Sequence, residues 1–330
     1  MGTADTHLVV RDDWAHRVNG CLLLAACGDA LGAPFEGAGR VDPVEVDQWM
    51  HDPTSLRWTD DTAMALVLAG HLVRRAGTVN EDELATEFAR EWARDPARGY
   101  GRGATATLSR INGGVPWADA AALIFDGEGS FGNGAAMRVA PVGLVAGLGL
   151  SAVAGRADRT AVVTHTHPLG RDGAVVQAVA VALAARWPAG EPLRPDRFLA
   201  RVTPYARTPQ FHQALARVAA LVEPPATPAR VAAELGNDAS ALRSVPAALA
   251  AFLVHPHQPR QALRFAICTG GDTDTIAAMT GALCGATGGA GNPPGRWTRR
   301  LEASSRMSTL ATALARLSRG PGRAPDRQVP

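Results

Sequence analysis

The chain has 330 residues, enough to bury a large hydrophobic core, so its stability requires neither disulfides nor a structural metal. Its 33 basic residues are all arginine and, with 31 acidic residues, they give a formal net charge of +2. Because the two signs are interspersed, the chain has no electrostatic footprint for nucleic acid or for an anionic membrane, and neither is an expected partner.

The four cysteines, Cys21, Cys27, Cys268 and Cys284, lie in apolar helix-like stretches without C-x-x-C spacing. This is typical of small core residues in a reducing compartment, and zinc is not expected. The N-terminus lacks a basic region followed by an apolar core, and no apolar run reaches the roughly 20 residues of a membrane span. We therefore expect a cytoplasmic protein with no membrane association.

Alanine- and leucine-rich segments, separated by glycine and proline clusters, predict an all-α chain. Residues 18–26 and 63–69 have almost no polar face, which is typical of helices at the centre of a large bundle. No shift in composition marks a domain boundary. We expect one domain over residues 13–318, a flexible N-terminus (1–12) and a disordered tail (319–330). The predicted helices are residues 18–31, 62–76, 81–93, 174–186, 211–221, 245–253, 276–284 and 301–317.

The first predicted helix ends in Gly28-Asp29-Ala30-Leu31-Gly32-Ala33-Pro34-Phe35-Glu36. Asp29 lies within the helix end, and we interpret it as a structural acid hydrogen-bonded to backbone rather than as a ligand. Glu36 lies on the loop that follows, where an isolated glutamate is more often a solvated surface residue.

A Thr-Asp-Asp turn, Thr59-Asp60-Asp61, stands at the N-terminus of the next apolar helix. Taken alone, this pattern is that of a helix N-cap. One cap needs one acceptor, so two carboxylates exceed what the helix end requires.

Two glycine-rich loops follow. The loop Gly99-Tyr100-Gly101-Arg102-Gly103 could bind an anion through its backbone amides, although the signal is weak on its own. Phe125 and Phe131, in the loop 125–134, could sandwich a planar base, although anchoring a loop to the core is the commoner use of such aromatics. In Thr164-His165-Thr166-His167-Pro168, we expect His165 to make polar contacts, such as donation to a phosphate, rather than to ligate a metal.

A second acidic turn, Gly270-Gly271-Asp272-Thr273-Asp274-Thr275, repeats the pattern before another apolar helix. Unpaired buried carboxylates are costly, and hard cations relieve that cost. Oxygen ligands without histidine or cysteine favour Mg²⁺, Mn²⁺ or Ca²⁺ over zinc. We therefore predict that the two turns meet around a pair of divalent metal ions. The candidate ligands are Thr59, Asp60, Asp61, Asp272, Asp274 and Thr275.

In this order the motifs resemble those of the ADP-ribosylglycohydrolase family, which includes the dinitrogenase-reductase-activating glycohydrolases and the vertebrate ADP-ribosylhydrolases. The resemblance spans almost the whole chain and implies a compact, single-domain orthogonal helical bundle with two Mg²⁺ or Mn²⁺ ions at the base of a cleft. It implies that the six candidate residues are the ligands and that Asp274 bridges the ions. The motifs that carry it are residues 28–32, 59–62, 132–134, Met137-Arg138, His165, 244–248 and 270–275.

The chain is most similar to the branch of this family that cleaves O-linked ADP-ribose, including serine-linked ADP-ribose, poly(ADP-ribose) and O-acetyl-ADP-ribose. This resemblance implies that Phe125 and Phe131 hold the adenine. Phe131 stands where a tyrosine is familiar, which removes a hydroxyl and keeps the stacking face. The ligand contacts that the resemblance implies are Gly99, Tyr100, Gly101, Gly103, Phe125, Gly129, Ser130, Phe131, Gly132, Asn133 and His165.

The expected function is metal-dependent hydrolysis of the glycosidic bond between ADP-ribose and its acceptor, with Glu36 as the acid/base group. We expect a monomer that acts on ADP-ribosylated proteins or small molecules, with nucleic acid a partner only when it is itself ADP-ribosylated. Three different functions stay open beside it: an arginine-ADP-ribose hydrolase, a catalytically silent ADP-ribose-binding relative and a metal-dependent phosphoesterase. Against a silent relative, Glu36 and all six candidate ligand positions carry oxygen-bearing side chains.

Overall fold

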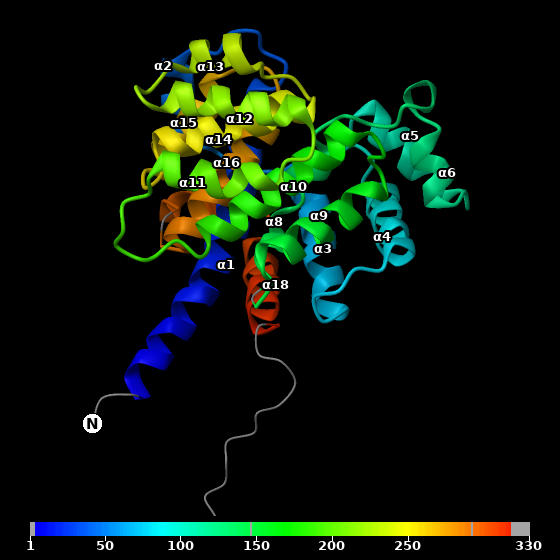
Figure 1. The fold of residues 1–330 in the computed structure, drawn as a ribbon, viewed down its shortest axis with the longest axis horizontal. Helices are drawn as coiled ribbons and strands as arrows, with labels where there is room; N and C mark the ends of the chain where they lie inside the picture. Colours follow the sequence, from blue (N-terminus) through cyan, green and yellow to red (C-terminus); the bar gives the residue numbers. More distant parts are fainter. Residues whose placement is uncertain (1–3, 146, 292, 318–330) are drawn as a thin grey trace, which may run out of the picture.

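A computed structural model describes residues 4–145, 147–291 and 293–317. Within these residues the chain forms α-helices and short 3-10 helices and no extended strand, which confirms the all-α prediction (Figure 1). The elements are α1 (Ala4–Gly32), η1 (Ala33–Phe35), α2 (Pro43–His51), α3 (Asp60–Arg74), α4 (Glu81–Arg94), α5 (Arg102–Asn112), α6 (Trp117–Ala122), η2 (Phe125–Gly127), α7 (Gly134–Met137), α8 (Ala140–Gly143), α9 (Leu150–Val162), α10 (Pro168–Ala184), α11 (Pro195–Val202), η3 (Thr203–Tyr205), α12 (Pro209–Val222), α13 (Pro228–Leu235), α14 (Ala241–Val254), α15 (Pro259–Cys268), α16 (Thr273–Gly288), α17 (Gly295–Arg300) and α18 (Ser304–Arg316).

Several helices begin at a capping residue that is followed directly by proline. Thr208 and Thr227 accept hydrogen bonds from backbone amides in the first turns of α12 and α13, and Asp42 does the same for α2. Proline suits the first helical position because its missing N–H has no partner there in any case. These local signals fix where the helices start.

The predicted helix 301–317 is wrong at its start, because the chain leaves the helical path between α17 and α18. The backbone amide of Leu56 donates to Arg300 O (3.0 Å), and that of Glu302 donates to Leu56 O (2.9 Å). Ala303 then adopts a left-handed φ of 52° before α18 begins. Pairing with a distant segment, which the local pattern does not contain, breaks the helix here.

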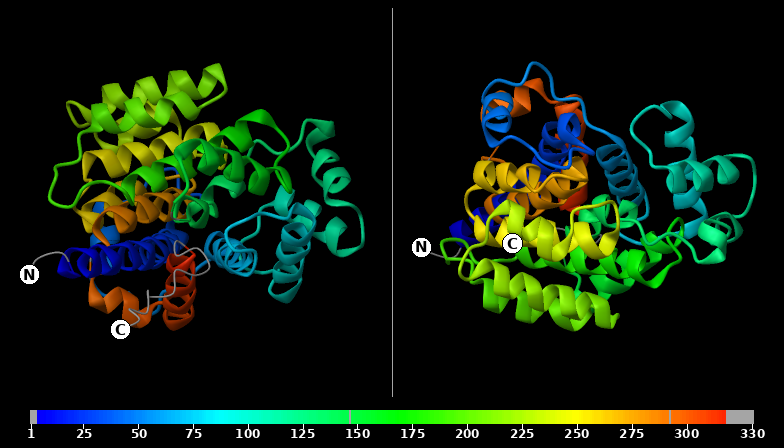
Figure 2. Two further views of the ribbon diagram at one scale, coloured as in Figure 1. Left: turned by 60° about the horizontal axis from the view of Figure 1, so that its bottom comes forward. Right: turned by 90° about the horizontal axis from the view of Figure 1, so that it is seen from above.

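Helices α1 and α16 pack side by side at the centre of the fold through glycines (Figure 2). A Cβ atom at Gly28 would overlap the carbonyl group of Ala277, and one at Gly285 would overlap the backbone of Gly20. Without side chains at these points the two backbones approach closely. The glycines of this contact are Gly20, Gly28, Gly32, Gly281 and Gly285.

The remaining helices cover this central pair in two groups (Figures 1 and 2). Helices α10, α14 and α15 contact α16 directly, and α11, α12 and α13 lie outside them. On the other side α18 packs against α1 and α3, and α4 and α5 continue outward from α3, while α9 packs against α10 and joins the two groups. One connected cluster of buried apolar residues runs through both groups. The helices therefore share a core, and their ends frame the cleft described below.

The expectation that no apolar run reaches membrane length needs correction. Residues 13–35 are long and apolar enough to span a membrane, with a mean hydropathy of 1.4, but 78% of the apolar window is buried inside the fold. A helix at the core of a bundle has the same apolar composition as a membrane span, because it is buried against other helices. The predicted tail (319–330) lies outside the described residues. So do the first residues of the predicted flexible N-terminus (1–12), whose described backbone begins with α1 at Ala4.

Candidate metal centre and ligand cleft

A cleft of about 440 Å³ opens where the ends of α3, α5, α7 and α16 converge, and most of the predicted site residues line it. The predicted residues in its wall are Glu36, Asp60, Asp61, Gly99, Gly101, Gly103, Phe125, Ser130, Phe131, Gly132, Asn133, His165, Asp272, Asp274 and Thr275. Thus segments that are more than 200 residues apart in sequence contribute to one site.

The first acidic turn forms the N-terminus of α3, as expected for a capping sequence. The Thr59 side chain caps the helix by accepting from Asp61 N (3.4 Å), while Asp60 and Asp61 are 7% and 3% exposed. Asp29 lies behind the turn and is fully buried. Its carboxylate accepts from Thr59 N (2.9 Å), Thr62 N (3.0 Å) and Thr62 Oγ1 (2.5 Å). Asp29 is therefore the structural acid that the sequence suggested, and it fixes the turn.

The second acidic turn forms the N-terminus of α16 and meets the first turn directly. Thr275 Oγ1 donates to Asp61 Oδ1 (3.3 Å) across the junction. Gly271 precedes the turn with a left-handed φ of 72°, a conformation that favours glycine. Thr273 Oγ1 donates to Gly32 O (2.9 Å), which ties the turn to the end of α1. The close packing of α1 and α16 thus places the two acidic turns together.

These carboxylates carry more negative charge than the protein neutralises. Burial, and then the charge of Asp29, raises the pKa of Asp60. Burial and Asp274 raise the pKa of Asp61 well above its ordinary value, and burial and Asp272 likewise raise that of Asp274. One oxygen of Asp61, Oδ2, is buried without a hydrogen-bond partner. Such a site favours an additional positive charge.

Glu36 follows η1 and reaches the same cluster from the exposed side. Oxygens of Glu36, Asp272 and Asp274 lie within 4.8 Å of one another. Burial raises the pKa of Glu36, and the neighbouring Asp272 raises it further. Glu36 is therefore a half-buried carboxyl group beside the acidic turns rather than an isolated surface glutamate.

The donor set fits hard divalent cations. It consists of carboxylate and hydroxyl oxygens, which Mg²⁺ and Mn²⁺ prefer, and it includes the unpartnered Asp61 oxygen. Among the described residues, neither histidine nor cysteine takes part in the acidic cluster. The arrangement can therefore hold cations next to a protonatable carboxyl group, which is Glu36.

An aromatic surface forms an exposed part of the cleft wall. Phe125 and Phe131 are 50% and 45% exposed, and their ring centroids lie 5.7 Å apart with the rings tilted by 40°. The backbone of this loop is tied to the start of α14, because Asn133 N donates to Ala239 O (2.9 Å) and Ala241 N donates to Phe131 O (3.0 Å). The two rings therefore form one accessible apolar surface on an anchored loop.

Asn133 joins this loop to the acidic cluster. Its Nδ2 donates to Asp272 Oδ2 (2.5 Å) and to Ser244 Oγ (3.0 Å). The side chain is 5% exposed, so both bonds are shielded from water. Asn133 thus connects three segments, and it is a link between the aromatic surface and a candidate metal ligand.

Three predicted site residues do not line the cleft. Thr59 is occupied with capping α3, as described above. The Tyr100 side chain packs against the core, and its hydroxyl is buried without a partner. Gly129 faces Thr166 rather than the cleft, and a Cβ there would overlap that side chain. These positions shape the loops that carry the other residues.

Sequence reasoning assigned no role in the site to Arg138, Thr164 or Asp238, which also line the cleft. Arg138 follows the Gly132-Asn133-Gly134 motif, which was the one available signal for it. Asp238 stands in a polar turn where it pairs with Arg243 (2.8 Å), and no local pattern distinguishes it from other surface acids.

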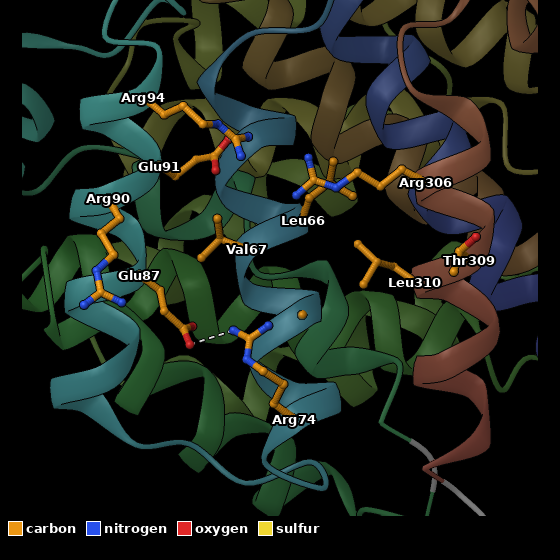
Figure 3. A pocket seen from close by; sticks show the side chains of 11 residues that line it. Leu66, Val67, Arg74, Glu87, Arg90, Glu91, Arg94, Arg306, Thr309 and Leu310 are labelled. Atoms are coloured by element: carbon orange, nitrogen blue, oxygen red, sulfur yellow. Dashed lines mark hydrogen bonds and ion pairs between the residues drawn. The ribbon is translucent and has the colours of Figure 1, made fainter.

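A larger hollow, of about 560 Å³, lies between α3, α4 and α18 (Figure 3). Its arginine and glutamate side chains come from exposed faces of these helices. Both glutamates are paired, because Glu87 accepts from Arg74 and Glu91 accepts from Arg94, each at 2.6 Å. In the described part of the chain this hollow holds no buried carboxylate oxygen without a partner, unlike the smaller cleft with Asp61 Oδ2, so the smaller cleft remains the candidate active site.

Comparison with known proteins places the chain among related sequences. A family model described as ADP-ribosylglycohydrolase matches residues 10–324. The ADP-ribosylhydrolase ARH3 of Bos taurus is 33% identical over 91% of this chain and 93% of its own length, and that of Homo sapiens is 32% identical over the same shares. The uncharacterised protein YegU of Escherichia coli is 30% identical over 91% of this chain and 96% of its own.

A solved structure described as an ADP-ribosylglycohydrolase-related protein complex has the same fold. It is 30% identical in sequence, covers 93% of this chain and 99% of its own, and superposes with a TM-score of 0.71. The helical-bundle fold that the motifs implied is thereby confirmed.

Proposed function

This chain belongs to the ADP-ribosylglycohydrolase family, and on that premise we propose that it is a metal-dependent hydrolase that releases ADP-ribose from O-linked acceptors. Serine-linked ADP-ribose, poly(ADP-ribose) and O-acetyl-ADP-ribose are the proposed substrates. The observation that carries the proposal is the meeting of two buried acidic turns beside Glu36, in a cleft that two exposed aromatic rings also line.

The two acidic turns would hold the cations, through Asp60 and Asp61 on one side and Asp272, Asp274 and Thr275 on the other. Bound there, Mg²⁺ or Mn²⁺ would act as a Lewis acid toward oxygens of the substrate. Thr59 was also a candidate ligand. Its hydroxyl accepts from Asp61 N and has a second lone pair, so Thr59 stays a proposed ligand that also shapes the turn.

Glu36 is the proposed acid/base residue. Burial favours its protonated form, which can protonate the leaving oxygen as the glycosidic bond breaks. Once ionised, the same carboxylate can take a proton from the attacking water. The ribose acquires positive charge in such a transition state, and the surrounding carboxylates stabilise that charge.

The remaining contacts would hold the ADP part of the substrate. Phe125 and Phe131 offer an apolar surface on which adenine can stack. Ser130 and His165 lie deeper in the same cleft, together with Gly101 and Gly103 near the start of α5, and would face the diphosphate. This arrangement orients the distal ribose toward Glu36 and the acidic turns.

The proposal is tested with a panel of serine-linked, arginine-linked and base-linked ADP-ribose, poly(ADP-ribose) and O-acetyl-ADP-ribose, each assayed with Mg²⁺, with Mn²⁺ and with chelator. We expect release of intact ADP-ribose from the O-linked substrates, loss of activity with chelator and recovery with added metal. Release from the arginine-linked substrate alone would assign the chain to the arginine-specific branch. Undiminished activity after exhaustive chelation would contradict a metal mechanism.

Product analysis distinguishes a glycohydrolase from a phosphoesterase and from a silent relative. A phosphoesterase would yield AMP, whereas a silent relative would bind ADP-ribose and release nothing. The double variant Asp60→Ala/Asp61→Ala tests the metal site, and it should lose both metal binding and hydrolysis. Asp47→Asn, which removes a surface ion pair with Arg264 (2.7 Å), supplies the control and should keep both.

A further inference from the structure

Arg138 is a buried cation at the base of the cleft, and its hydrogen bonds go to neutral groups. It is 1% exposed and lies over the Phe88 ring, with 4.3 Å from the guanidinium carbon to the ring centroid. Nη2 donates to Thr160 O (3.0 Å) and to Thr164 Oγ1 (2.7 Å). Among the described residues no ion pair joins Arg138 to a carboxylate; the charge of Asp60 acts on it only at longer range, and burial lowers the pKa of Arg138 to about 9. Burying a charge in this way costs folding free energy, because the guanidinium loses its hydration. We therefore asked what the guanidinium does in the site.

The bond from Arg138 determines how the Thr164 hydroxyl is used. A guanidinium can only donate, so Thr164 Oγ1 accepts from Arg138 and keeps its own proton for another partner. The other neighbour of this oxygen is His165 Nδ1, at 2.8 Å, and Thr164 is 2% exposed. The oxygen has two lone pairs and could accept from both neighbours, but its own proton would then have no acceptor among the described residues. Because a buried hydroxyl proton without a partner is costly, the hydroxyl is best satisfied by donating to Nδ1, which accepts through its lone pair.

The opposite edge of the imidazole faces the cleft. Among the described residues no hydrogen bond joins His165 Nε2 to the protein, and His165 lines the cleft together with Ser130. Gly134 and Gly170 leave room for the ring, since a Cβ at Gly134 would lie 3.2 Å from Nε2 and one at Gly170 would lie 3.3 Å from Cδ2. With Nδ1 accepting, a neutral ring carries its proton on Nε2.

We propose that Arg138 and Thr164 are positioning residues that hold His165 as a neutral imidazole with its proton on Nε2, which presents an N–H donor to an anionic group in the cleft. This inference rests on the proposed function only for the identity of that group, a diphosphate. The positive charge of Arg138 also lies close enough to oppose formation of an imidazolium. Burial, and then Arg138, lowers the pKa of His165 to about 3.

The tautomer is read directly by two-bond ¹⁵N–¹H correlation spectra of the full chain labelled with ¹⁵N-histidine. The variant His165→Gln identifies the His165 signals by their loss from among the nine histidines. We expect a protonated Nε2 and an unprotonated Nδ1 in the wild type. Thr164→Ser keeps the hydroxyl and should keep this pattern. Thr164→Val removes the hydroxyl and should give a mixture of tautomers.

The same variants are titrated with ADP-ribose by calorimetry. In Thr164→Val only a fraction of the molecules has His165 protonated on Nε2, so the affinity for ADP-ribose should fall by about two- to fivefold. The affinity of Thr164→Ser should be unchanged. A wild-type His165 that is protonated on Nδ1, or on both nitrogens at neutral pH, would overturn the inference, as would an unchanged tautomer in Thr164→Val. If Nε2 is protonated and ADP-ribose fails to bind, the positioning of His165 by Arg138 and Thr164 is supported and the proposed function fails.

Discussion

Replacing Gly32 with alanine should loosen the metal centre through a steric effect alone. Gly32 has right-handed φ and ψ of −78° and −34°, so alanine introduces no backbone strain. Its Cβ would lie 2.5 Å from Thr273 O and 2.6 Å from Asp274 Cα. Ordinary contacts begin near 3.4 Å, so the first turn of α16 must retreat by about 0.8 Å. That exceeds the tolerance of about 0.5 Å for a functional constellation.

Two magnitudes follow for Gly32→Ala. Overpacking of this kind costs about 1–3 kcal/mol of unfolding free energy. At about 0.7 kcal/mol per degree for a chain of this length, the melting temperature should fall by about 1–4 °C. Displacement of Asp274 should weaken Mg²⁺ or Mn²⁺ binding by about 10- to 100-fold, the range found when the support of a metal ligand is disturbed. Differential scanning calorimetry and metal titration measure the two effects.

Two other glycines supply matched controls for Gly32→Ala. Gly285→Ala creates a tighter overlap, 2.1 Å from the added Cβ to Gly20 O, at the part of the α1–α16 contact remote from the acidic turn. It should lower the melting temperature and leave metal affinity unchanged. Gly155→Ala meets nothing within 4 Å and should be neutral or slightly stabilising. Equal metal affinity in Gly32→Ala and Gly285→Ala, at equal loss of stability, would refute the reasoning.

Three further predictions follow from the site. Glu36→Gln should lose about 10²- to 10⁴-fold in turnover and still bind ADP-ribose, because only the acid/base group is removed; wild-type turnover would exclude Glu36 from that role. Asp29→Asn should weaken metal binding about tenfold or more by releasing the first acidic turn. Asp172→Asn is the control, because Asp172 accepts the same set of hydrogen bonds, from Arg207 and Thr208. It should leave metal binding unchanged, and an equal loss of metal binding in both variants would mean that the effect is general destabilisation. Because the pKa of His165 is lowered from 6.5 to about 3 on folding, acid protonates the unfolded chain first and stability falls below pH 6.5. Between pH 7.5 and 5.5 the wild type should therefore lose about 1.4 kcal/mol more unfolding free energy than His165→Gln, as measured by chemical denaturation; equal losses would contradict a neutral buried His165.

The local chemistry of the site could be predicted from sequence, whereas its assembly could not. Each acidic turn is a contiguous motif before an apolar helix, so Asp60, Asp61, Asp272 and Asp274 were identifiable as excess carboxylates. That the turns meet depends on the close packing of α1 and α16, which spacing along the chain does not encode. The expectation came instead from the repeated pattern and from the family resemblance.

The direction of side chains within loops also could not be predicted from the sequence. Tyr100 lies in a glycine-rich loop that reaches the cleft, but its ring turns into the core. Arg138 and Thr164 are 26 residues apart and belong to different segments, so no local pattern announces their hydrogen bond. Polar partners of this kind are found only once the helices between them are placed.

The bond from Asn133 to Asp272 has a thermodynamic consequence for the whole cleft. Asn133 belongs to the loop that bears Phe131, and Asp272 belongs to the acidic turn, so a change in either segment is felt by the other. Binding equilibria linked in this way are reciprocal: the factor by which a bound nucleotide tightens cation binding is the factor by which the cation tightens nucleotide binding. On the proposed function, the apparent affinity for ADP-ribose would then be a function of the concentration of free metal ion, and the affinity for the metal ion a function of the concentration of ADP-ribose.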